Sequence, residues 1–371
     1  MVDPKLITDP NLRPIALKVS TGEEITKEEA KLLLTTNDII GLGNLANHIR
    51  EEINGNDAYY GVNMNMNYTN ICELRCPLCA FSCDAGDDEA YLYSLDEIEE
   101  RVRGAVEFGI DEVHIVGGLH AELKLDYFEE MLRRIKGVNK DLFIVAFTAA
   151  EYDYFARLNN MTVEEVMGRF IDAGLGAIPG GGAEVFAEDK RKIIAPKKIT
   201  GNRWLEVMKI AHGLGLKTNA TLLYNHIEDI DDIIDHMFRL RELQKETGGF
   251  KTFVPLQFHE ENTEIKSKRK TSTGFDDIRL YATARIFLRN IPHIKALWMY
   301  VGEKMAQLLL NFGVDDIGAT YHYEKVVHAA GAATPDIGSE NHLRRLITAA
   351  GREPVRATAD YQKKNNESRE R

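Results

Sequence analysis

The sequence predicts an α/β fold, a (βα)8 barrel of the TIM type with N-terminal and C-terminal helical additions. Short runs of β-branched or apolar residues alternate with segments of helical periodicity through the middle of the 371-residue chain. Strand–helix units at this spacing are typical of a parallel sheet. Eight such runs occur, which is the number that closes a barrel. No low-complexity linker interrupts them, so we expect one large domain.

The expected strands follow one another along the chain. They are Gly61–Asn67, Glu112–Val116, Phe143–Phe147, Gly176–Ile178, Lys217–Leu223, Thr252–Leu256, His293–Trp298 and Asp315–Ile317. Helical patterns lie between them, for example over Leu95–Phe108 and Trp204–Leu214. Ser94 and Glu97 have the spacing of a capping box, so we expect a helix to begin there.

The two ends of the chain are expected to lie outside the barrel. Residues 1–57 are predicted to form an N-terminal helical extension, with helices over Lys27–Leu34 and Asn44–Ile53. Residues 58–320 are predicted to form the barrel, and residues 321–371 a C-terminal helical extension. The segment after Thr358 (ADYQKKNNESRER) is polar, and we expect it to fray.

Composition excludes several function classes. The chain has 46 Lys+Arg and 58 Asp+Glu, a net charge of −12, and no dense basic stripe, which argues against nucleic-acid binding. The longest apolar runs are too short to span a membrane. Residues 1–17 are polar and carry no apolar signal-peptide core. We therefore expect a cytoplasmic protein that acts on a small molecule, with no membrane partner.

The four cysteines lie close together in the sequence. Cys72, Cys76 and Cys79 form a C-x3-C-x2-C triplet in NYTNICELRCPLCAF, and Cys83 follows four residues later. Structural cysteines would be scattered through the core, whereas clustered thiols act on metals or in redox chemistry. A disulfide framework is not expected, because such frameworks staple small secreted domains.

Two metal sites are compatible with this spacing. Structural zinc takes four ligands, usually from two separated C-x2-C knuckles, and the sequence has no second knuckle. Iron–sulfur clusters accept such runs of thiolates, and three ligands leave one iron of a four-iron cluster open for a substrate or cofactor. The spacing favours the cluster. The alternative is a zinc-stabilised, non-catalytic binding protein with Cys83 as the fourth ligand.

Glycine and acidic residues follow two of the expected strands, where barrels place their active sites. Gly117 and Gly118 follow the second strand, and two glycines allow the backbone to approach a ligand closely. Gly180, Gly181 and Gly182 follow the fourth strand and lead to Glu184. A carboxylate in such a loop can accept hydrogen bonds from ribose hydroxyls. An ordinary solvated turn is the simpler alternative for each loop.

Other polar side chains stand just past strands and are candidates for contact with substrate. His120, His226 and His259 each follow a strand and can donate a hydrogen bond to a substrate carboxylate, so they are the candidate catalytic residues. A second metal held by these three is a weaker hypothesis. Arg75, Thr148 and Tyr224 are the candidate substrate-binding residues.

The triplet after a strand resembles the signature of the radical SAM enzymes. The resemblance implies that Cys72, Cys76 and Cys79 hold a [4Fe–4S] cluster whose open iron binds S-adenosylmethionine (SAM). It also implies that the Gly117–Gly118 loop binds the methionyl amino group of SAM. The third residue of that loop is usually acidic, but here it is Leu119. The contact is then expected from backbone carbonyls or another side chain.

Longer stretches resemble a narrower group, the aminodeoxyfutalosine synthases of menaquinone biosynthesis. They are VGGLHAEL, AFTAAE, IPGGGAEVF, TLLYNHIED, FHEENTE and GEKMAQLLLNFGVDDIGAT. The resemblance implies addition of the 5′-deoxyadenosyl radical of SAM to the enol-ether double bond of 3-[(1-carboxyvinyl)oxy]benzoate, followed by rearrangement and loss of carbon dioxide. It also implies an electron donor such as flavodoxin or ferredoxin. The nearest alternative is the related cyclic dehypoxanthinyl futalosine synthase, which abstracts hydrogen and cyclises its substrate; the deazaflavin (FO) synthases are also similar.

Overall fold

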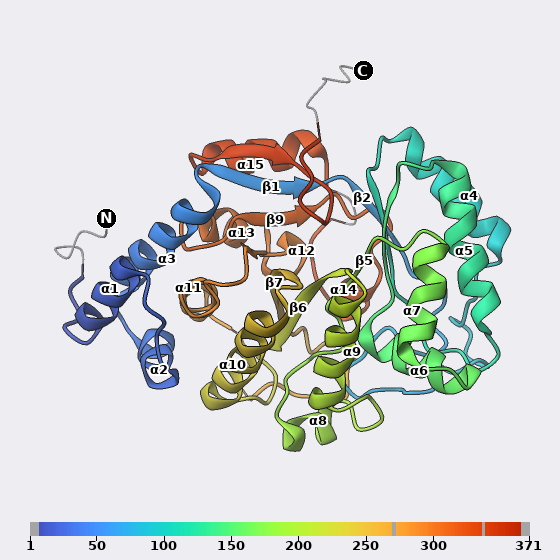
Figure 1. The fold of residues 1–371 in the computed structure, drawn as a ribbon, viewed down its shortest axis with the longest axis horizontal. Coiled ribbons are helices and arrows are strands. Elements are labelled where there is room, and N and C mark those ends of the chain that lie inside the picture. Colours follow the sequence, from blue (N-terminus) through green and yellow to red (C-terminus); the bar gives the residue numbers. More distant parts are fainter. Residues whose placement is uncertain (1–6, 269–271, 336–337, 365–371) are drawn as a thin grey trace.

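The fold is built around a curled parallel sheet. A computed structural model describes residues 7–268, 272–335 and 338–364. Seven strands follow one another in chain order across the sheet (Figure 1). They are β2 (Asn63–Met66), β3 (Glu112–Ile115), β4 (Phe143–Ala146), β5 (Ala177–Ile178), β6 (Lys217–Tyr224), β7 (Phe250–Gln257) and β8 (His293–Ile294). All six pairings are parallel, so the carboxyl ends of the strands share one edge.

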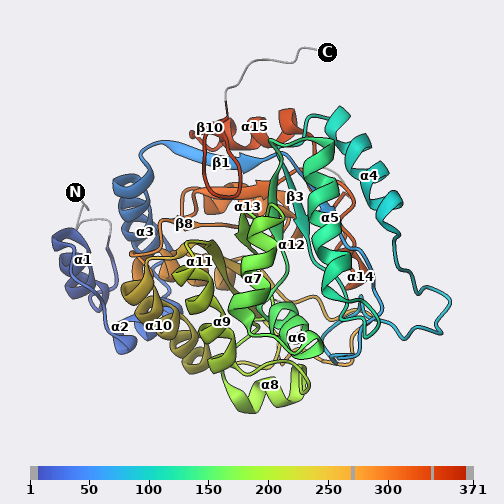
Figure 2. The same ribbon diagram turned by 45° about the vertical axis from the view of Figure 1, so that its right-hand side comes forward.

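Every connection between these strands contains a helix, and most of these helices cover the outer face of the sheet (Figure 2). They are α4 (Leu95–Glu107), α5 (Leu125–Val138), α6 (Ala149–Asn159), α7 (Val163–Asp172), α8 (Glu188–Ile194), α9 (Gly201–Gly213), α10 (Ile230–Thr247) and α11 (Gly274–Phe287). The capping box expected at Ser94 is present, since the Ser94 N–H donates to Glu97 Oε2 at 2.7 Å. α12 (Trp298–Val301) and α13 (Glu303–Leu309) follow β8.

The eighth strand closes the ring through single bridges. β9 (Asp316–Ala319) pairs with β1 (Asp57–Gly61) in a second parallel sheet of order β10-β1-β9. It still reaches β8, because the Ala296 N–H donates to the Asp316 carbonyl at 2.8 Å. On its other side the chain after β9 reaches β2, where the Asn65 N–H donates to the His322 carbonyl at 2.8 Å. The predicted TIM-type barrel is confirmed, with its seam at β9.

The structure differs from the prediction at both flanks of the barrel. The expected first strand, Gly61–Asn67, corresponds to β2, and β1 before it, which was not predicted, joins the second sheet. The region after Tyr323 was expected to be helical. It contains α14 (Val326–Ala329) and α15 (Glu340–Ala349), but also the strand β10 (Glu353–Arg356). Its four residues (EPVR) carry no strand pattern, and the strand forms because the edge of β1 is available for pairing.

The polar C-terminal segment is folded as far as it is described, which corrects the expectation that it frays after Thr358. The Tyr361 ring stacks on His293 with centroids 3.4 Å apart. Its hydroxyl donates to Asp316 Oδ2 at 2.8 Å. One half-buried aromatic side chain thus anchors a segment that is otherwise polar. Residues 365–371 lie outside the described part of the chain.

Three helices precede β1 and lie on the outside of the barrel. They are α1 (Leu12–Thr21), α2 (Lys27–Thr35) and α3 (Ile39–Asn54). α2 contacts α10 and α11, and α3 contacts α11 (Figure 1).

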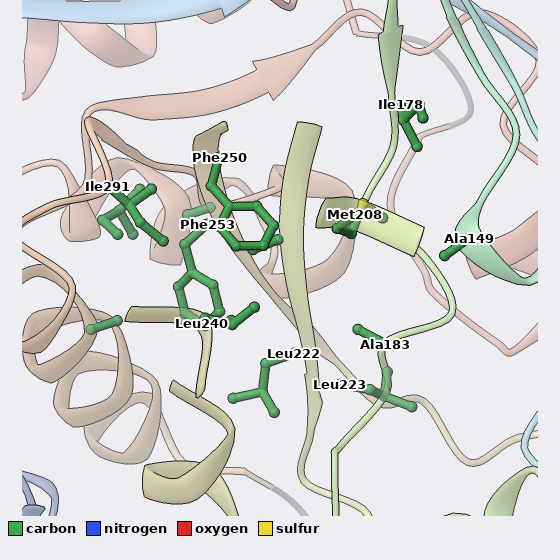
Figure 3. Packing of buried hydrophobic residues seen from close by; sticks show 14 of the residues in the cluster. Ala149, Ile178, Ala183, Met208, Leu222, Leu223, Leu240, Phe250, Phe253 and Ile291 are labelled. Atoms are coloured by element: carbon green, nitrogen blue, oxygen red, sulfur yellow. The ribbon is translucent and has the colours of Figure 1, made fainter. Parts of the chain in front are cut away.

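The main core lies between the strands and the surrounding helices. Leu222 of β6, Phe253 of β7 and Leu240 of α10 are fully buried in this layer (Figure 3). Successive side chains of a strand point to opposite faces, so Leu223 lies on the other side of β6 and lines the barrel interior. Each fully buried leucine or phenylalanine stabilises the fold by about 1.5–3 kcal/mol. The apolar side chains between the strands and the helices therefore stabilise the fold, and the interior of the barrel can hold polar residues.

Candidate active site

One cavity of about 380 Å³ joins the carboxyl ends of the strands to the barrel interior. The loops that follow β2, β3, β4 and β5 line its upper end, and the C-terminal segment lines its base at Ala359. The residues expected to hold a cofactor all line it: Cys72, Cys76, Cys79, Gly117, Gly118 and Glu184. A TIM-type barrel places its active site at this edge, so the cavity is the candidate active site.

Three of the four cysteines face this cavity. The loop that carries them is fixed by backbone hydrogen bonds, from Cys72 N–H to the Cys83 carbonyl at 3.1 Å and from Cys79 N–H to the Cys76 carbonyl at 2.8 Å. Burial raises the pKa of the Cys76 thiol, while the nearby Lys198 ammonium acts in the opposite direction. Cys83 is buried outside the cavity lining, and its neighbouring charges come from Asp87, Glu89, Arg75 and Asp84 rather than from another thiol.

This donor set fits an iron–sulfur cluster. In the described residues no three His, Cys, Asp or Glu side chains converge as a mononuclear metal site requires. A four-iron cluster spreads three thiolates over three different irons, so its ligands stand farther apart. The same observation shows that His120, His226 and His259 are not brought together as ligands of a second metal.

The Gly117–Gly118 loop packs directly beneath the cysteine loop. The Gly118 N–H donates to the Thr69 carbonyl at 2.9 Å. A Cβ atom at Gly118 would overlap the Ile71 carbonyl oxygen, so this position requires glycine. Glu151 of α6 holds the loop from the other side, because its Oε1 accepts from the Gly117 N–H at 3.1 Å and from the Tyr68 hydroxyl at 3.2 Å. Both oxygens of Glu151 are used within the protein, because Oε2 also accepts from the Thr148 N–H at 2.6 Å.

Glu184 stands at the end of the glycine loop after β5 and carries a positive φ of 46°. Its carboxylate lies 2.7 Å from the Lys198 ammonium. Burial alone would raise the pKa of Glu184, but Lys198 and Arg191 hold it below its usual value. Arg191 of α8 is itself buried and donates to the Gly182 and Val185 carbonyls at 3.2 Å. The site therefore presents an ionised carboxylate on a rigid loop beside the cysteines.

The predicted substrate residues fall into two groups. Thr148 and His259 line the cavity. The Nε2–H of His259 donates to the Tyr300 carbonyl at 3.0 Å, and burial lowers the pKa of the ring. A neutral His259 therefore offers only an acceptor, Nδ1, to the cavity.

The other four candidates do not line the cavity. His226 uses both ring nitrogens, with Nε2 donating to the Leu223 carbonyl at 3.0 Å and Nδ1 accepting from the Ile227 N–H at 2.7 Å. His120 Nδ1 accepts from the Glu122 N–H at 3.2 Å. Tyr224 donates to Asp277 Oδ1 at 2.9 Å, and Arg75 lies 3.6 Å from Asp84.

Sequence reasoning missed polar residues inside the barrel. Glu112, His114 and Asn219 line the cavity from within their strands, and Lys295 lines it directly after β8. The alternation in EVHIV was a usable signal, since it places Glu112 and His114 on the face opposite the apolar Val113 and Ile115. Lys198 gave no signal, because its partner Glu184 is distant in sequence and the two meet only in the folded chain.

Two known protein families match consecutive parts of the chain. The radical SAM superfamily pattern matches residues 66–240, and the CofH/MqnC C-terminal region pattern matches residues 247–369. The chain is 39% identical to the aminodeoxyfutalosine synthase of Thermus thermophilus, over 96% of each chain. It is also 39% identical to the 5-amino-6-(D-ribitylamino)uracil–L-tyrosine 4-hydroxyphenyl transferase of Archaeoglobus fulgidus, over 85% of this chain and 92% of the relative.

Two further comparisons agree with this assignment. The cyclic dehypoxanthine futalosine synthase of Streptomyces coelicolor is 36% identical, over 95% of this chain and 88% of the relative. The crystal structure of methylornithine synthase has the same fold, with a TM-score of 0.73 and 17% identity over 92% of this chain and 97% of that one. No helix in the described part of the chain is long and apolar enough to cross a membrane.

The cysteine loop, the fold and these relatives lead to one assignment: the chain belongs to the radical SAM superfamily, in the group of the aminodeoxyfutalosine synthases, and is an enzyme that uses a [4Fe–4S] cluster and S-adenosylmethionine.

Proposed function

We propose that this enzyme is an aminodeoxyfutalosine synthase. It joins the 5′-deoxyadenosyl group of SAM to the enol-ether double bond of 3-[(1-carboxyvinyl)oxy]benzoate. The adduct rearranges by attack on the ring, loses carbon dioxide and returns one electron, which gives 6-amino-6-deoxyfutalosine. The observation that carries the proposal is the continuous cavity, which brings the cysteine loop and a space for an aromatic substrate into one enclosure.

Relatives with the neighbouring activities are about as similar to the chain as the synthases are. The T. thermophilus synthase is 39% identical over 96% of both chains, and two of the transferases are 39% identical over 85% and 37% identical over 95% of this chain. A shared fold alone does not choose between activities. The choice therefore rests on the substrate that the cavity accepts.

Residues of the chain have separate roles in this proposal. Cys72, Cys76 and Cys79 hold the cluster, which when bound supplies the electron that makes the adenosyl group of SAM reactive. The other proposed contacts with SAM come from Gly117, Gly118 and Glu184. Glu184 accepts hydrogen bonds from the ribose hydroxyls, and the Gly117–Gly118 backbone receives the methionyl amino group.

The chain's remaining task is to hold the alkene near the 5′ carbon and to exclude other hydrogen donors. Reacting atoms held near van der Waals contact replace a bimolecular encounter with an intramolecular step. Thr148 and His259 are the proposed polar contacts at the upper end of the substrate. His120, His226, Arg75 and Tyr224 are proposed to act from outside the cavity by shaping the loops that line it.

The electron donor is proposed to be a small acidic carrier such as a flavodoxin or ferredoxin. The segment after α8 lies against the cysteine loop, because the Leu78 N–H donates to the Ile194 carbonyl at 3.2 Å. The neighbouring Ile193 is 56% exposed, and Lys192 and Lys197 beside it are exposed. An exposed apolar side chain between cations is the complement of an acidic carrier surface.

The test is an anaerobic incubation of the cluster-loaded enzyme with SAM, a reductant and each candidate substrate. Adenosyl carbon in a product made from the enol-ether benzoate supports the proposal. Free 5′-deoxyadenosine with a cyclised product would identify the cyclic synthase activity instead. Consumption of tyrosine with 5-amino-6-(D-ribitylamino)uracil would identify the transferase activity.

A further inference from the structure

The lower half of the cavity is polar and closed. Asn65, His114 and Asn219 line the cavity inside the barrel, below the loops that carry the cysteines. The C-terminal segment covers the base, because the Ala359 N–H donates to Glu112 Oε2 at 2.6 Å and Ala359 lines the cavity. A ligand that extends from the cysteine loop into the barrel therefore ends at polar side chains and not in bulk water.

Two groups in this lower half have donors without a partner in the described part of the chain. Asn219 Oδ1 accepts from the Lys251 ammonium at 2.5 Å, but no acceptor faces its Nδ2 group. His114 forms no hydrogen bond through either ring nitrogen there. Both side chains line the cavity, so these donors are available to a ligand that enters it.

His114 differs in this respect from the histidines nearer the loops. His226 uses both nitrogens within the protein, and His259 has already donated its proton to a carbonyl. Burial, together with the nearby Lys251 and Lys295, lowers the pKa of His114 to about 4. The ring is therefore neutral near pH 7 and keeps one N–H to donate into the cavity.

The charges and the shape of this region select the class of ligand. Lys295 is held by Asp316 at 2.9 Å, and although burial opposes its charge, Asp316 and Glu112 raise its pKa, so it stays an ammonium. Val145 of β4 pairs with His114 of β3. Val254 of β7 pairs with Thr221, which lies two residues beyond Asn219 on β6. An apolar ring can lie against these valines while an attached anion reaches the donors below.

We propose that His114 and Asn219 form the subsite for the ring carboxylate of the substrate, with the Lys295 ammonium beside it. This inference rests on the proposed function, because it assigns one end of the same substrate. The enol ether must lie near SAM at the upper end of the cavity, so the benzoate carboxylate is the acid group at the far end. The subsite fixes the substrate's direction in the barrel and excludes molecules without an anion at that end.

Two isosteric variants test the subsite. His114→Phe keeps an aromatic ring and removes both nitrogens. Asn219→Asp keeps the oxygen that accepts from Lys251 and replaces the free donor with a charged acceptor. The matched control is His322→Phe, since the His322 ring lies outside the cavity and packs on Phe108 at 5.2 Å.

Binding is measured by anaerobic calorimetry on the cluster-loaded enzyme with SAM and without reductant, so that no turnover occurs. The ligands are 3-[(1-carboxyvinyl)oxy]benzoate and the same ether without the ring carboxylate. A lost hydrogen bond to a charged group predicts that each variant binds the full substrate at least ~10-fold more weakly. The variants should bind the shortened ether within ~2-fold of wild type, because that ligand makes no such bond.

The outcomes separate this inference from the proposed function. If wild type converts the substrate while both variants bind it unchanged, the subsite is overturned and the function stands. Equal losses for both ligands would also overturn the subsite, because they would indicate a change of shape. If wild type neither binds nor converts the enol-ether benzoate, the proposed function is wrong, and the subsite that rests on it is wrong as well.

Discussion

The ammonium of Lys198 lies 2.7 Å from the Glu184 carboxylate, and both side chains are largely buried beside the cysteine loop. Replacing Lys198 by Met removes the cation that contacts the carboxylate and leaves the more weakly acting Arg191 nearby. An uncompensated buried charge costs about 3–5 kcal/mol. We therefore expect Lys198→Met to lose about 3 kcal/mol of unfolding free energy, measured by urea denaturation of the cluster-free chain.

Lys190→Met provides the matched control. The nearest partner of Lys190 is Asp189 at 2.8 Å, which is 72% exposed, and Asp232 and Asp229 lie farther off at 3.7 and 4.0 Å. Water screens exposed ion pairs, so this variant should be nearly as stable as wild type. Equal losses of unfolding free energy in the two variants would show that Lys198 does not stabilise the Glu184 carboxylate.

Glu151 is expected to make the stability of the enzyme depend on pH. Burial raises its pKa to about 7, although hydrogen bonds from Thr148, Gly117 and Tyr68 act in the opposite direction. The folded chain therefore binds this proton more tightly than the unfolded chain, and stability falls as pH rises from about 4.5 to 7. At 1.36 kcal/mol per pKa unit, the stability difference between wild type and Glu151→Gln should shrink by about 3 kcal/mol over this range.

Glu165 gives a control of opposite sign. It occupies the same capping-box position in α7 as Glu151 does in α6, after Thr162 instead of Thr148. Its pKa is lowered by hydrogen bonds from Thr162, so its contribution is lost as pH falls below the usual range of a glutamate. Urea denaturation curves at several pH values should show the difference for Glu165→Gln growing with rising pH. The same trend for both variants would contradict the proposed effect of burial.

The parts of the fold that depend on local pattern could be predicted from the sequence. The inner strands are runs of β-branched and apolar residues, and the capping box at Ser94 predicts the start of a helix. The seam could not be predicted, because β9 pairs with β1, reaches the end of β8 through one bridge, and leaves the contact with β2 to the chain that follows it. β10 was missed for a similar reason, since four residues form a strand only where an edge is available.

The candidate site divides in the same way. The cysteine triplet and the glycine loops could be recognised because each is contiguous in sequence. Lys198 and Glu151 could not, because each acts on a loop from another part of the chain. His226 illustrates the opposite error: its place after a strand suggested a substrate contact, but its ring is turned into the protein and bonds to Leu223 and Ile227.

Cys76 and Cys83 should differ in their effect on the cluster. Cys76 lines the cavity with Cys72 and Cys79, whereas Cys83 is buried outside the lining. We expect Cys76→Ala to lose most of its iron and sulfide after anaerobic reconstitution, because a four-iron cluster with two thiolates is poorly held. Cys83→Ala should keep the iron content and absorbance of wild type. Loss of iron in Cys83→Ala would favour a site with four cysteine ligands.

The exposed lysines beside the cysteine loop should affect the rate of electron delivery by a protein carrier and leave the later steps of turnover unchanged. Lys192 and Lys197 flank Ile193 in the segment that accepts a hydrogen bond from Leu78. Reversing both charges (Lys192→Glu with Lys197→Glu) should repel an acidic carrier and slow turnover with reduced flavodoxin by about 10-fold at low salt. Turnover with a small chemical reductant should stay at the wild-type rate, because that reductant needs no docking surface. Lys140 and Lys217 are exposed and lie at the amino ends of β4 and β6, at the opposite edge of the sheet, so the control pair Lys140→Glu with Lys217→Glu should change neither rate. If the control slows flavodoxin-driven turnover as much, net charge and not this surface governs the encounter.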